Sequence, residues 1–234
     1  MTMTKTAVMA LLKENKNERG IAHWKKRPRK LKSFGIGLTQ LRKFAKQIGR
    51  DHKLALQLWK SDVYDAKILG LLVDEPKRVT YEQAELQVEQ LGEGMLVHVF
   101  ASCDATLAKT PFAFELANEW MDHQDPVRRQ CGFSLLYELS KKKKLAGMDD
   151  EYLLERIQFI QDHIREEEMW VRESMNSALF AIGKRNLKLN RAAIRAAKVI
   201  GPVDIDYGDD NSCEPLDVLK HLDCKALQER LKGK

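Results

Sequence analysis

The chain has 234 residues, of which 44% are hydrophobic and 32% are charged, and its formal net charge is +6. This composition can form a sizeable core, and the length fits one compact domain or a short helical solenoid, so a disordered chain is excluded. The sequence has no run of 18 apolar residues and no signal-peptide cleavage site, which predicts a protein without a membrane span.

The first predicted element is the basic N-terminal region, residues 1–50, which we expect to form helices. It contains 14 basic and 2 acidic residues, whereas the rest of the chain contains 26 basic and 32 acidic ones. Ten of the basic residues lie within 25–50, where no acidic residue occurs. A basic segment beside an acidic remainder indicates a polyanionic partner.

The second predicted region, residues 51–200, consists of helical repeats. Apolar residues recur with the helical period from residue 38 onward, in the segments 38–48, 51–60, 62–73, 112–121, 126–139, 153–164 and 171–182. Only Val203–Tyr207 alternates as a strand would. The fold class predicted from this pattern is all-α.

The predicted helices also resemble one another. An apolar residue precedes a leucine by eight positions in three copies, as Tyr64 and Leu72, Val127 and Leu135, and Val171 and Leu179. The copies are offset by 63 and 44 residues, and the larger gap has room for a less regular helical unit at about 80–107. We therefore expect a HEAT-like solenoid, a right-handed superhelix of antiparallel helix pairs with a concave basic face. An irregular helical bundle is the alternative.

The third predicted region, residues 201–234, is an acidic C-terminal cap that completes a single domain spanning 1–234. Five acidic residues lie within 204–214, namely Asp204, Asp206, Asp209, Asp210 and Glu214. Their order lacks the third loop ligand and the terminal Glu of an EF-hand, so we expect a structured loop and no metal site. The four cysteines have no CxxC spacing and predict reduced thiols in a cytoplasmic protein, with Cys103 and Cys131 buried and inert. No cofactor motif is present.

Phosphate groups bind exposed lysines and arginines through charge and counterion release. The basic side chains that we expect at a DNA interface are Lys25, Lys26, Arg27, Arg29, Arg42, Lys46, Arg128 and Arg129. Trp24 adjoins the basic run and is a candidate for stacking on a base, whereas Trp59 and Trp120 end apolar helix faces and are expected in the core. We interpret Lys141–Lys144 as a solvated cluster that complements the dipole of a helix end.

Several segments of the sequence, in their order along the chain, resemble the HEAT-like-repeat DNA alkylation-repair family. The best-known members of that family are DNA glycosylases of the alkylpurine DNA glycosylase D type. The resemblance covers about residues 30–215. It rests on Phe34–Arg42, Leu58–Ser61 followed by Tyr64, Val97–Ser102, Trp120 followed by Asp125–Arg129, and Gly201–Cys213. It implies an all-α HEAT-like fold and binding to DNA, including damaged or branched DNA. For the best-known members it also implies release of N3- and N7-alkylated purines.

The resemblance also implies a catalytic set, from which this sequence departs. Known glycosylases of the family have a Trp four residues before a catalytic Asp, and here Gly94 and His98 stand at those two positions. A later Trp of the family's binding surface corresponds to Ser177. The arginine that contacts DNA near the lesion is matched by Arg128 or Arg129.

A carboxylate stabilises the positive charge that develops as a glycosidic bond breaks, and a neutral His98 cannot do so. Two catalytic alternatives remain. In the first, His98 is a general base and acts together with Arg128. In the second, Glu93 substitutes for the missing carboxylate. We therefore expect a monomeric, cytoplasmic DNA-binding protein without a cofactor, and enzymatic activity stays open. The alternatives are an active N3/N7-alkylpurine glycosylase with a replaced catalytic set and a HEAT-like protein-interaction scaffold.

Overall fold

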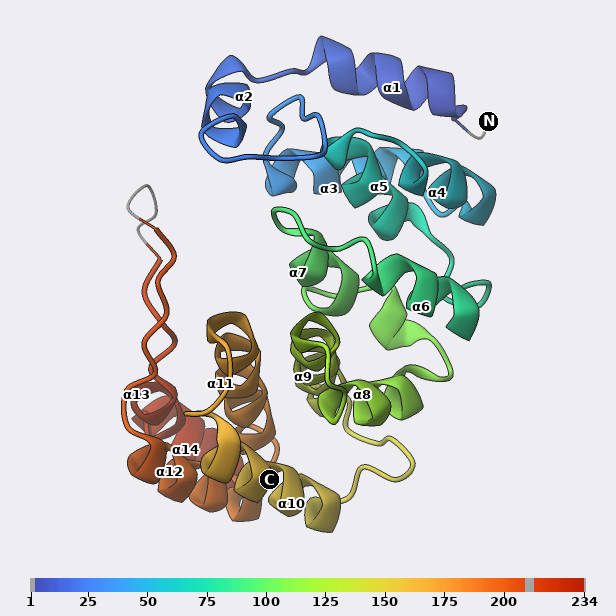
Figure 1. Cartoon of the computed structure of the whole chain (residues 1–234). Helices are drawn as coiled ribbons and strands as arrows, with labels where there is room; N and C mark the ends of the chain where they lie inside the picture. The colour runs from blue at the N-terminus through green and yellow to red at the C-terminus, as the bar shows by residue number, and fades with distance from the viewer. Residues whose placement is uncertain (1–2, 209–212, 234) are drawn as a thin grey trace. The chain divides into compact units, whose positions relative to one another are not determined.

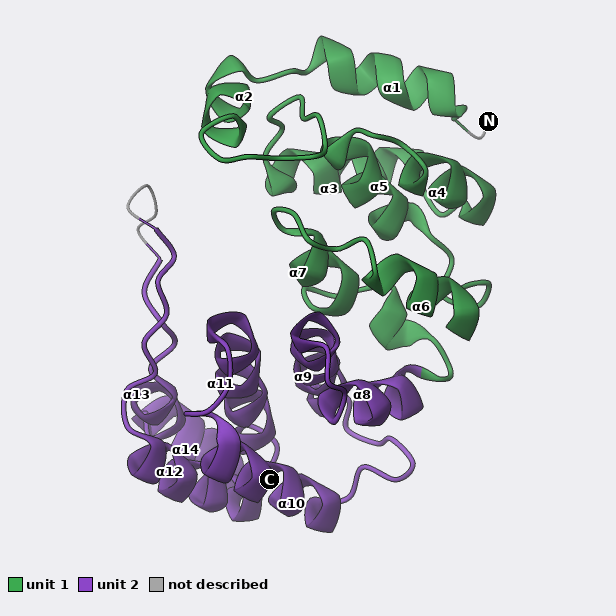
Figure 2. Cartoon of the chain, viewed as in Figure 1, with its two compact units in different colours: residues 1–112 green, residues 113–234 purple. Residues whose placement is uncertain are grey.

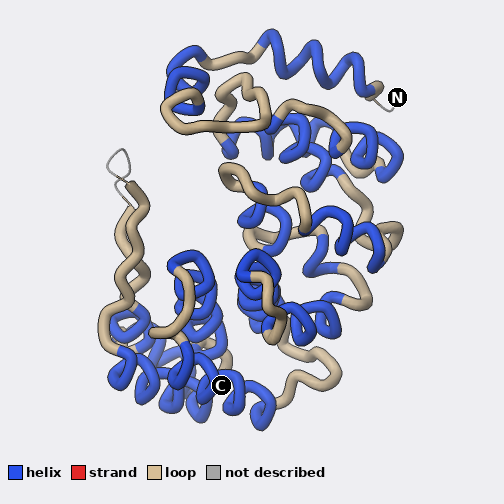
Figure 3. The backbone as a smooth tube through the Cα atoms, in the orientation of Figure 1, coloured by secondary structure: helices blue, strands red, loops and turns tan. Residues whose placement is uncertain are grey.

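A computed structural model describes residues 3–208 and 213–233 and consists of helices joined by loops of different lengths (Figure 1). Within these residues there are fourteen α-helices, one 3₁₀ helix and no strand (Figure 3). The prediction of an all-α fold is confirmed. The chain divides into two compact units, Met1–Phe112 and Ala113–Lys234 (Figure 2).

In the first unit, the central helix is α5 (Tyr64–Val73), nine of whose ten residues are buried. It packs against α1, α3, α4 and α7, so the basic N-terminal region shares one core with the residues that follow it. The other helices of this unit are α1 (Lys5–Glu14), α2 (Glu18–Trp24), α3 (Leu38–Ile48), α4 (His52–Trp59), α6 (Tyr81–Val88), α7 (Leu96–Ala101) and the 3₁₀ helix η1 (Leu107–Lys109).

Helix α5 buries two charged side chains, Asp65 and Lys67, in an otherwise apolar sequence. The Lys67 ammonium donates to the Trp59 carbonyl at 2.7 Å and to Gln90 Oε1 at 3.2 Å, and it lies 4.2 Å from the centre of the Trp59 ring. Burial lowers the pKa of Lys67. Trp59 itself is buried, which confirms its predicted place in the core.

In the second unit, α9 (Pro126–Ser140) packs against α8 (Ala113–Met121) and α11 (Met169–Gly183). Asp125 caps the start of α9 by accepting from the Val127 amide at 3.0 Å, and Pro126 occupies the first turn, where its missing N–H is harmless. Gly132 allows a close approach of α8, because a Cβ there would lie 2.6 Å from the Met121 nitrogen. The remaining helices are α10 (Asp150–His163), α12 (Leu187–Ile200), α13 (Val218–Leu222) and α14 (Lys225–Lys232).

The three copies of the sequence repeat lie in α5, α9 and α11, with Tyr64, Val127 and Val171 in the first turn of each helix. The less regular unit expected at about 80–107 is present as α6, α7 and η1. Trp120 is 1% exposed, as predicted for the core.

The alternating segment Val203–Tyr207 forms no strand, which agrees with the predicted all-α fold. Val203 and Ile205 are buried, so their alternation reflects burial alone. One prediction about the cysteines needs correction. Cys103 is half-buried, and only Cys131 is buried as expected.

Asp209 and Asp210 of the acidic segment lie outside the described residues. Elsewhere in the described chain, no group of three His, Cys, Asp or Glu side chains is arranged to hold a metal ion. None of the helices within 3–208 and 213–233 has the length and apolar character needed to cross a membrane.

Candidate nucleic-acid interface

The segment Lys25–Lys32, here called the basic loop, follows α2 and holds six cationic residues. All six are exposed: Lys25, Lys26, Arg27, Arg29, Lys30 and Lys32. Lys32 forms an exposed ion pair with Asp62 at 2.7 Å, and the Arg29 guanidinium lies 4.8 Å from the centre of the Trp24 ring. The loop thus presents a dense positive charge to solvent.

Glu93 fixes the C-terminal end of the basic loop. Its carboxylate accepts from the backbone amides of Lys30 at 2.6 Å and Leu31 at 3.1 Å. A carboxylate that accepts two backbone amides makes strong, charge-assisted hydrogen bonds. Glu93 was the alternative catalytic carboxylate, and that role stays a prediction; in the structure its carboxylate supports this loop.

Asp65 fixes the segment that follows the basic loop. Its side chain is fully buried and accepts from Ser33 Oγ at 2.9 Å, from the Phe34 amide at 2.8 Å and from the Ile36 amide at 3.0 Å. A buried carboxylate is stable only with such partners. Asp65 therefore ties the chain between the basic loop and α3 to the central helix α5.

The aromatic pair of Trp24 and Tyr64 supports the basic loop. The rings of Trp24 and Tyr64 lie 4.4 Å apart between centroids, and the Trp24 indole N–H donates to the Leu31 carbonyl at 2.9 Å. The Tyr64 hydroxyl accepts from the Met95 amide at 3.0 Å, and burial raises the pKa of Tyr64 to about 12. Trp24 remains a predicted base contact, but this geometry gives its ring a packing role.

Gly94 stands where the resemblance implied a Trp, and it cannot accept a side chain in this backbone. Its φ is +59°, and a Cβ would lie 2.8 Å from the Tyr64 ring and 3.0 Å from the Trp24 ring. The space beside residue 94 is therefore filled by aromatic rings that come from other parts of unit 1.

The basic residues in and just after α3 differ in their contacts. Lys46 is exposed, and Arg42 is half-buried, with one N–H donating to the Cys103 carbonyl at 3.4 Å. Arg50, which follows α3, donates to the carbonyls of Leu72 at 3.0 Å and Asp74 at 2.5 Å. These two hydrogen bonds join Arg50 to the C-terminal end of α5.

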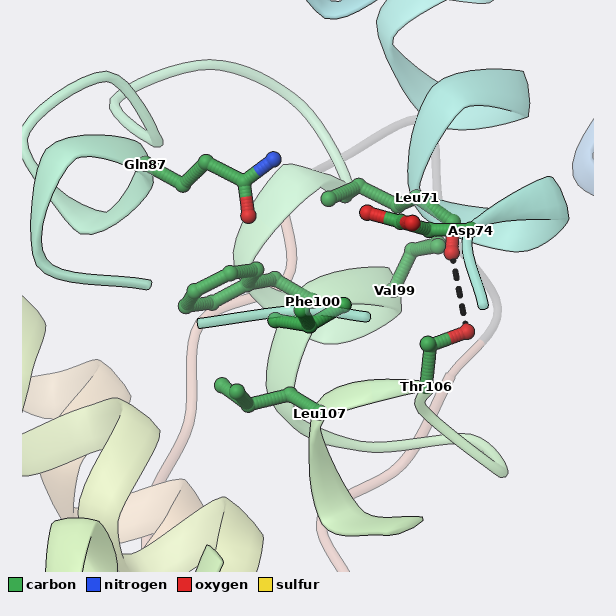
Figure 4. Close-up of a pocket in the computed structure, with 8 residues that line it drawn as sticks. Leu71, Asp74, Gln87, Val99, Phe100, Thr106 and Leu107 are labelled. Atoms are coloured by element: carbon green, nitrogen blue, oxygen red, sulfur yellow. Dashed lines mark hydrogen bonds between the residues drawn. The ribbon is translucent and has the colours of Figure 1, made fainter. Parts of the chain in front are cut away.

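His98, the candidate catalytic residue, lies in α7 with its Nε2 atom 2.5 Å from Cys103 Sγ. Cys103 and Asp104 both have positive φ values, +51° and +67°. The cavity beside α7 has a volume of about 10 Å³, and Val99, Phe100, Leu71 and Thr106 border it, with the Thr106 hydroxyl bonded to the Leu71 carbonyl at 3.0 Å (Figure 4). This cavity has room for one water molecule and none for a purine.

Arg128 and Arg129 lie at the start of α9 in the second unit. The Arg128 guanidinium pairs with Asp125 at 3.1 Å, and its side chain is 12% exposed. Arg129 makes two-point contact with the Glu167 carboxylate, at 2.8 and 2.9 Å, and also donates to the carbonyls of His123 and Gln124. Ser177, which the resemblance implied at the position of the family's later Trp, lies in α11, and its hydroxyl is 3.3 Å from Glu173 Oε1. Phosphate contact by either arginine stays a prediction.

The structure therefore gathers Trp24, Lys25, Lys26, Arg27 and Arg29 at one loop of unit 1. Sequence reasoning missed the groups that hold this loop, Asp65, Tyr64 and the supporting role of Glu93. One signal was available for Asp65, because an acidic residue inside an apolar helix must find buried partners. Nothing local in the sequence indicates which loop Glu93 binds.

The chain is similar to a protein family, to two bacterial proteins and to a solved structure. The family model described as "DNA alkylation repair enzyme" matches residues 7–205. Uncharacterized proteins of Listeria innocua (Lin0241) and Listeria monocytogenes (Lmo0209) are 26% and 25% identical over 198 residues, which is 84% of this chain and 84% of each relative.

A solved structure has the same fold, with a TM-score of 0.82 at 20% identity over 98% of this chain and 96% of that one. It is described as "a new family of proteins related to the HEAT-like repeat DNA glycosylases with affinity for branched DNA structures". This likeness establishes the HEAT-like fold.

Proposed function

Because the chain belongs to the DNA alkylation repair enzyme family, we propose that it binds duplex or branched DNA through the phosphate backbone and that the basic loop is its principal contact. The single observation that carries this proposal is a loop of six exposed cations whose C-terminal end is held by Glu93 and whose following segment is held by Asp65. A positively charged loop held in one conformation loses little entropy when it binds phosphates.

Branched DNA is the favoured ligand because the solved structure with the same fold carries that description. The proposal includes the right-handed superhelix with a concave basic face that the repeats predicted, to which Arg42, Lys46, Arg128 and Arg129 would add contacts. DNA binding by a monomer without a cofactor is part of the same proposal.

Base excision is not part of this proposal. The position expected to hold the catalytic Asp has His98, whose Nε2 contacts Cys103, and the nearby carboxylate of Glu93 supports the basic loop. The alternative of a protein-interaction scaffold is not favoured by any contact described above.

The test is a binding assay with three fluorescent probes of equal length: a four-way junction, a duplex and a single strand, each titrated at several salt concentrations. We expect the junction to bind most tightly, with log K falling linearly against log salt. Absence of binding to every probe at low salt would overturn the proposal. Release of methylated base from alkylated duplex, measured in parallel, would instead establish a glycosylase.

A further inference from the structure

A second basic site lies within unit 2, in a pocket of about 670 Å³ where α9 and α11 end. Its other walls come from the start of α10 and from α14. We call it the lysine pocket, and its six cationic residues are Lys141, Lys142, Lys143, Lys184, Arg185 and Arg230. Its volume falls within the range of small-molecule sites.

Positive charge dominates the lysine pocket. Its acidic residue, Asp150, accepts from the Asn186 amide at 2.9 and 3.1 Å. Glu138 is buried nearby and pairs with Lys141 at 2.8 Å. Two helix C-termini add partial negative charges of about half a unit each. Six cations exceed these opposing charges, so the pocket is suited to an anion.

Arg185 offsets part of the negative charge at the C-terminal end of α9. Its Nη1 donates to the carbonyls of Ser140 at 2.8 Å and Lys142 at 2.6 Å. These are carbonyls that a helix end would otherwise leave facing the pocket. Arg185 therefore fixes the turn that carries Lys141, Lys142 and Lys143.

Two half-buried aromatic rings hold lysines at this site. The Lys141 ammonium lies 4.1 Å from the centre of the Tyr137 ring, and the Lys184 ammonium lies 4.6 Å from that of Phe180. Such contacts restrain a flexible lysine while its charge stays accessible. The ring faces also suit a nucleobase.

Ser140 supplies the independent observation. It lines the pocket, is 2% exposed, and its Oγ has no hydrogen-bond partner among the described residues. An unpaired buried hydroxyl costs free energy unless a ligand or water satisfies it. A phosphate oxygen is a suitable acceptor for this hydroxyl.

We propose that the lysine pocket binds phosphate groups, with Lys143 and Lys184 as ligands and Ser140 as a hydrogen-bond donor. The site goes beyond the DNA contact proposed for unit 1 and does not depend on the basic loop. Its phosphates come either from a free nucleotide or from a nucleic-acid strand, and one set of probes distinguishes these sources.

The experiment is calorimetric titration of the full chain with pyrophosphate, ADP and a short single-stranded oligonucleotide with and without a 5′-phosphate. We expect the double substitution Lys143→Gln with Lys184→Gln to lower the affinity for the probes that bind by about tenfold. The matched control, Lys188→Gln with Lys198→Gln, removes two exposed cations of α12 and should change binding less than about twofold. Binding of pyrophosphate and ADP alone identifies a nucleotide site, and oligonucleotide binding that Lys143→Gln with Lys184→Gln weakens identifies a strand contact at the pocket.

Ser140→Ala separates binding from folding. Because its hydroxyl has no partner, we expect an unchanged or higher Tm together with about threefold weaker probe binding. No binding of any probe, or equal losses in the pocket and control variants, would overturn the proposal. A basic-loop variant (Lys25→Gln, Arg27→Gln, Lys30→Gln) should retain full pocket binding, so this result is independent of the function proposed for unit 1.

Discussion

The basic loop of unit 1 and the two arginines at the start of α9 in unit 2 are both positively charged. They differ in which of their atoms the neighbouring acidic residues contact. In and just after the loop, the carboxylates of Glu93 and Asp65 bind backbone amides, and the cationic side chains of the loop stay exposed. At α9, carboxylates bind the guanidinium groups themselves. Exposed positive charge is therefore retained where acidic residues hold the main chain, and it is partly neutralised where they hold the side chain.

The largest expected effect is the loss of folding stability caused by Arg129→Gln. Arg129→Gln leaves Glu167, whose side chain is 13% exposed, without its two-point partner and removes two bonds to carbonyls. We expect the free energy of unfolding to fall by about 3 kcal/mol, measured by urea denaturation. Arg191→Gln, an exposed arginine of α12, is the control and should change it by less than about 0.5 kcal/mol. Weaker DNA binding by Arg129→Gln without loss of stability would contradict the structural role.

The next effect concerns Asp65. Asp65→Asn places an amide opposite three hydrogen-bond donors, so we expect a loss of about 2 kcal/mol and faster trypsin cleavage within the basic loop. Asp62→Asn removes an exposed carboxylate close in sequence and is the control, with an expected change under about 0.5 kcal/mol. Equal cleavage rates in both variants would show that Asp65 does not hold the loop.

A smaller effect is expected at Gly94. Gly94→Ala adds a Cβ at positive φ against the Tyr64 ring, which should cost about 1–2 kcal/mol. At Gly92 a Cβ meets nothing within 4 Å, so Gly92→Ala is the matched control and should be close to neutral. Thermal unfolding of the two variants compares them directly. Similar Tm values would remove the explanation given for the glycine at this position.

The smallest effect at neutral pH comes from Tyr64. Its pKa is raised from 10.0 to about 12, so the folded chain keeps this proton at pH values where the unfolded chain has lost it. The associated stability is complete below pH 10 and is lost as pH rises toward 12, by roughly 1 kcal/mol at pH 11. Tyr64→Phe should make the pH dependence of unfolding shallower over this range. An unchanged dependence would show that Tyr64 is not protected.

The helical period predicted the helices because burial on one face repeats locally along the chain. Trp59, Trp120 and the three repeat copies were placed correctly for this reason. The alternation of Val203 and Ile205 follows from burial without a strand, since burial against a protein surface needs no partner strand.

The site was less predictable, because its decisive contacts join residues far apart in sequence. Lys30 and Glu93 are 63 positions apart, and Arg129 and Glu167 are 38 apart. Charge counting placed Arg129 beside the loop cations as an equal candidate, and only the contacts separate the two. Cys103 was expected to be buried, and the turn that holds its thiol near His98 has no local signature.

The central claim is that the cations of the basic loop bind phosphate. It is tested most directly by comparing two triple variants for junction binding against salt concentration. Lys25→Gln, Arg27→Gln and Lys30→Gln neutralise the loop, while Lys13→Gln, Lys53→Gln and Lys77→Gln remove three other exposed charges of unit 1. We predict that the loop variant lowers the slope of log K against log salt by about 2–3 and weakens binding at least about tenfold, and that the control lowers the slope by less than about 1. Equal losses in the two variants would contradict the account, since they would show that only total charge matters.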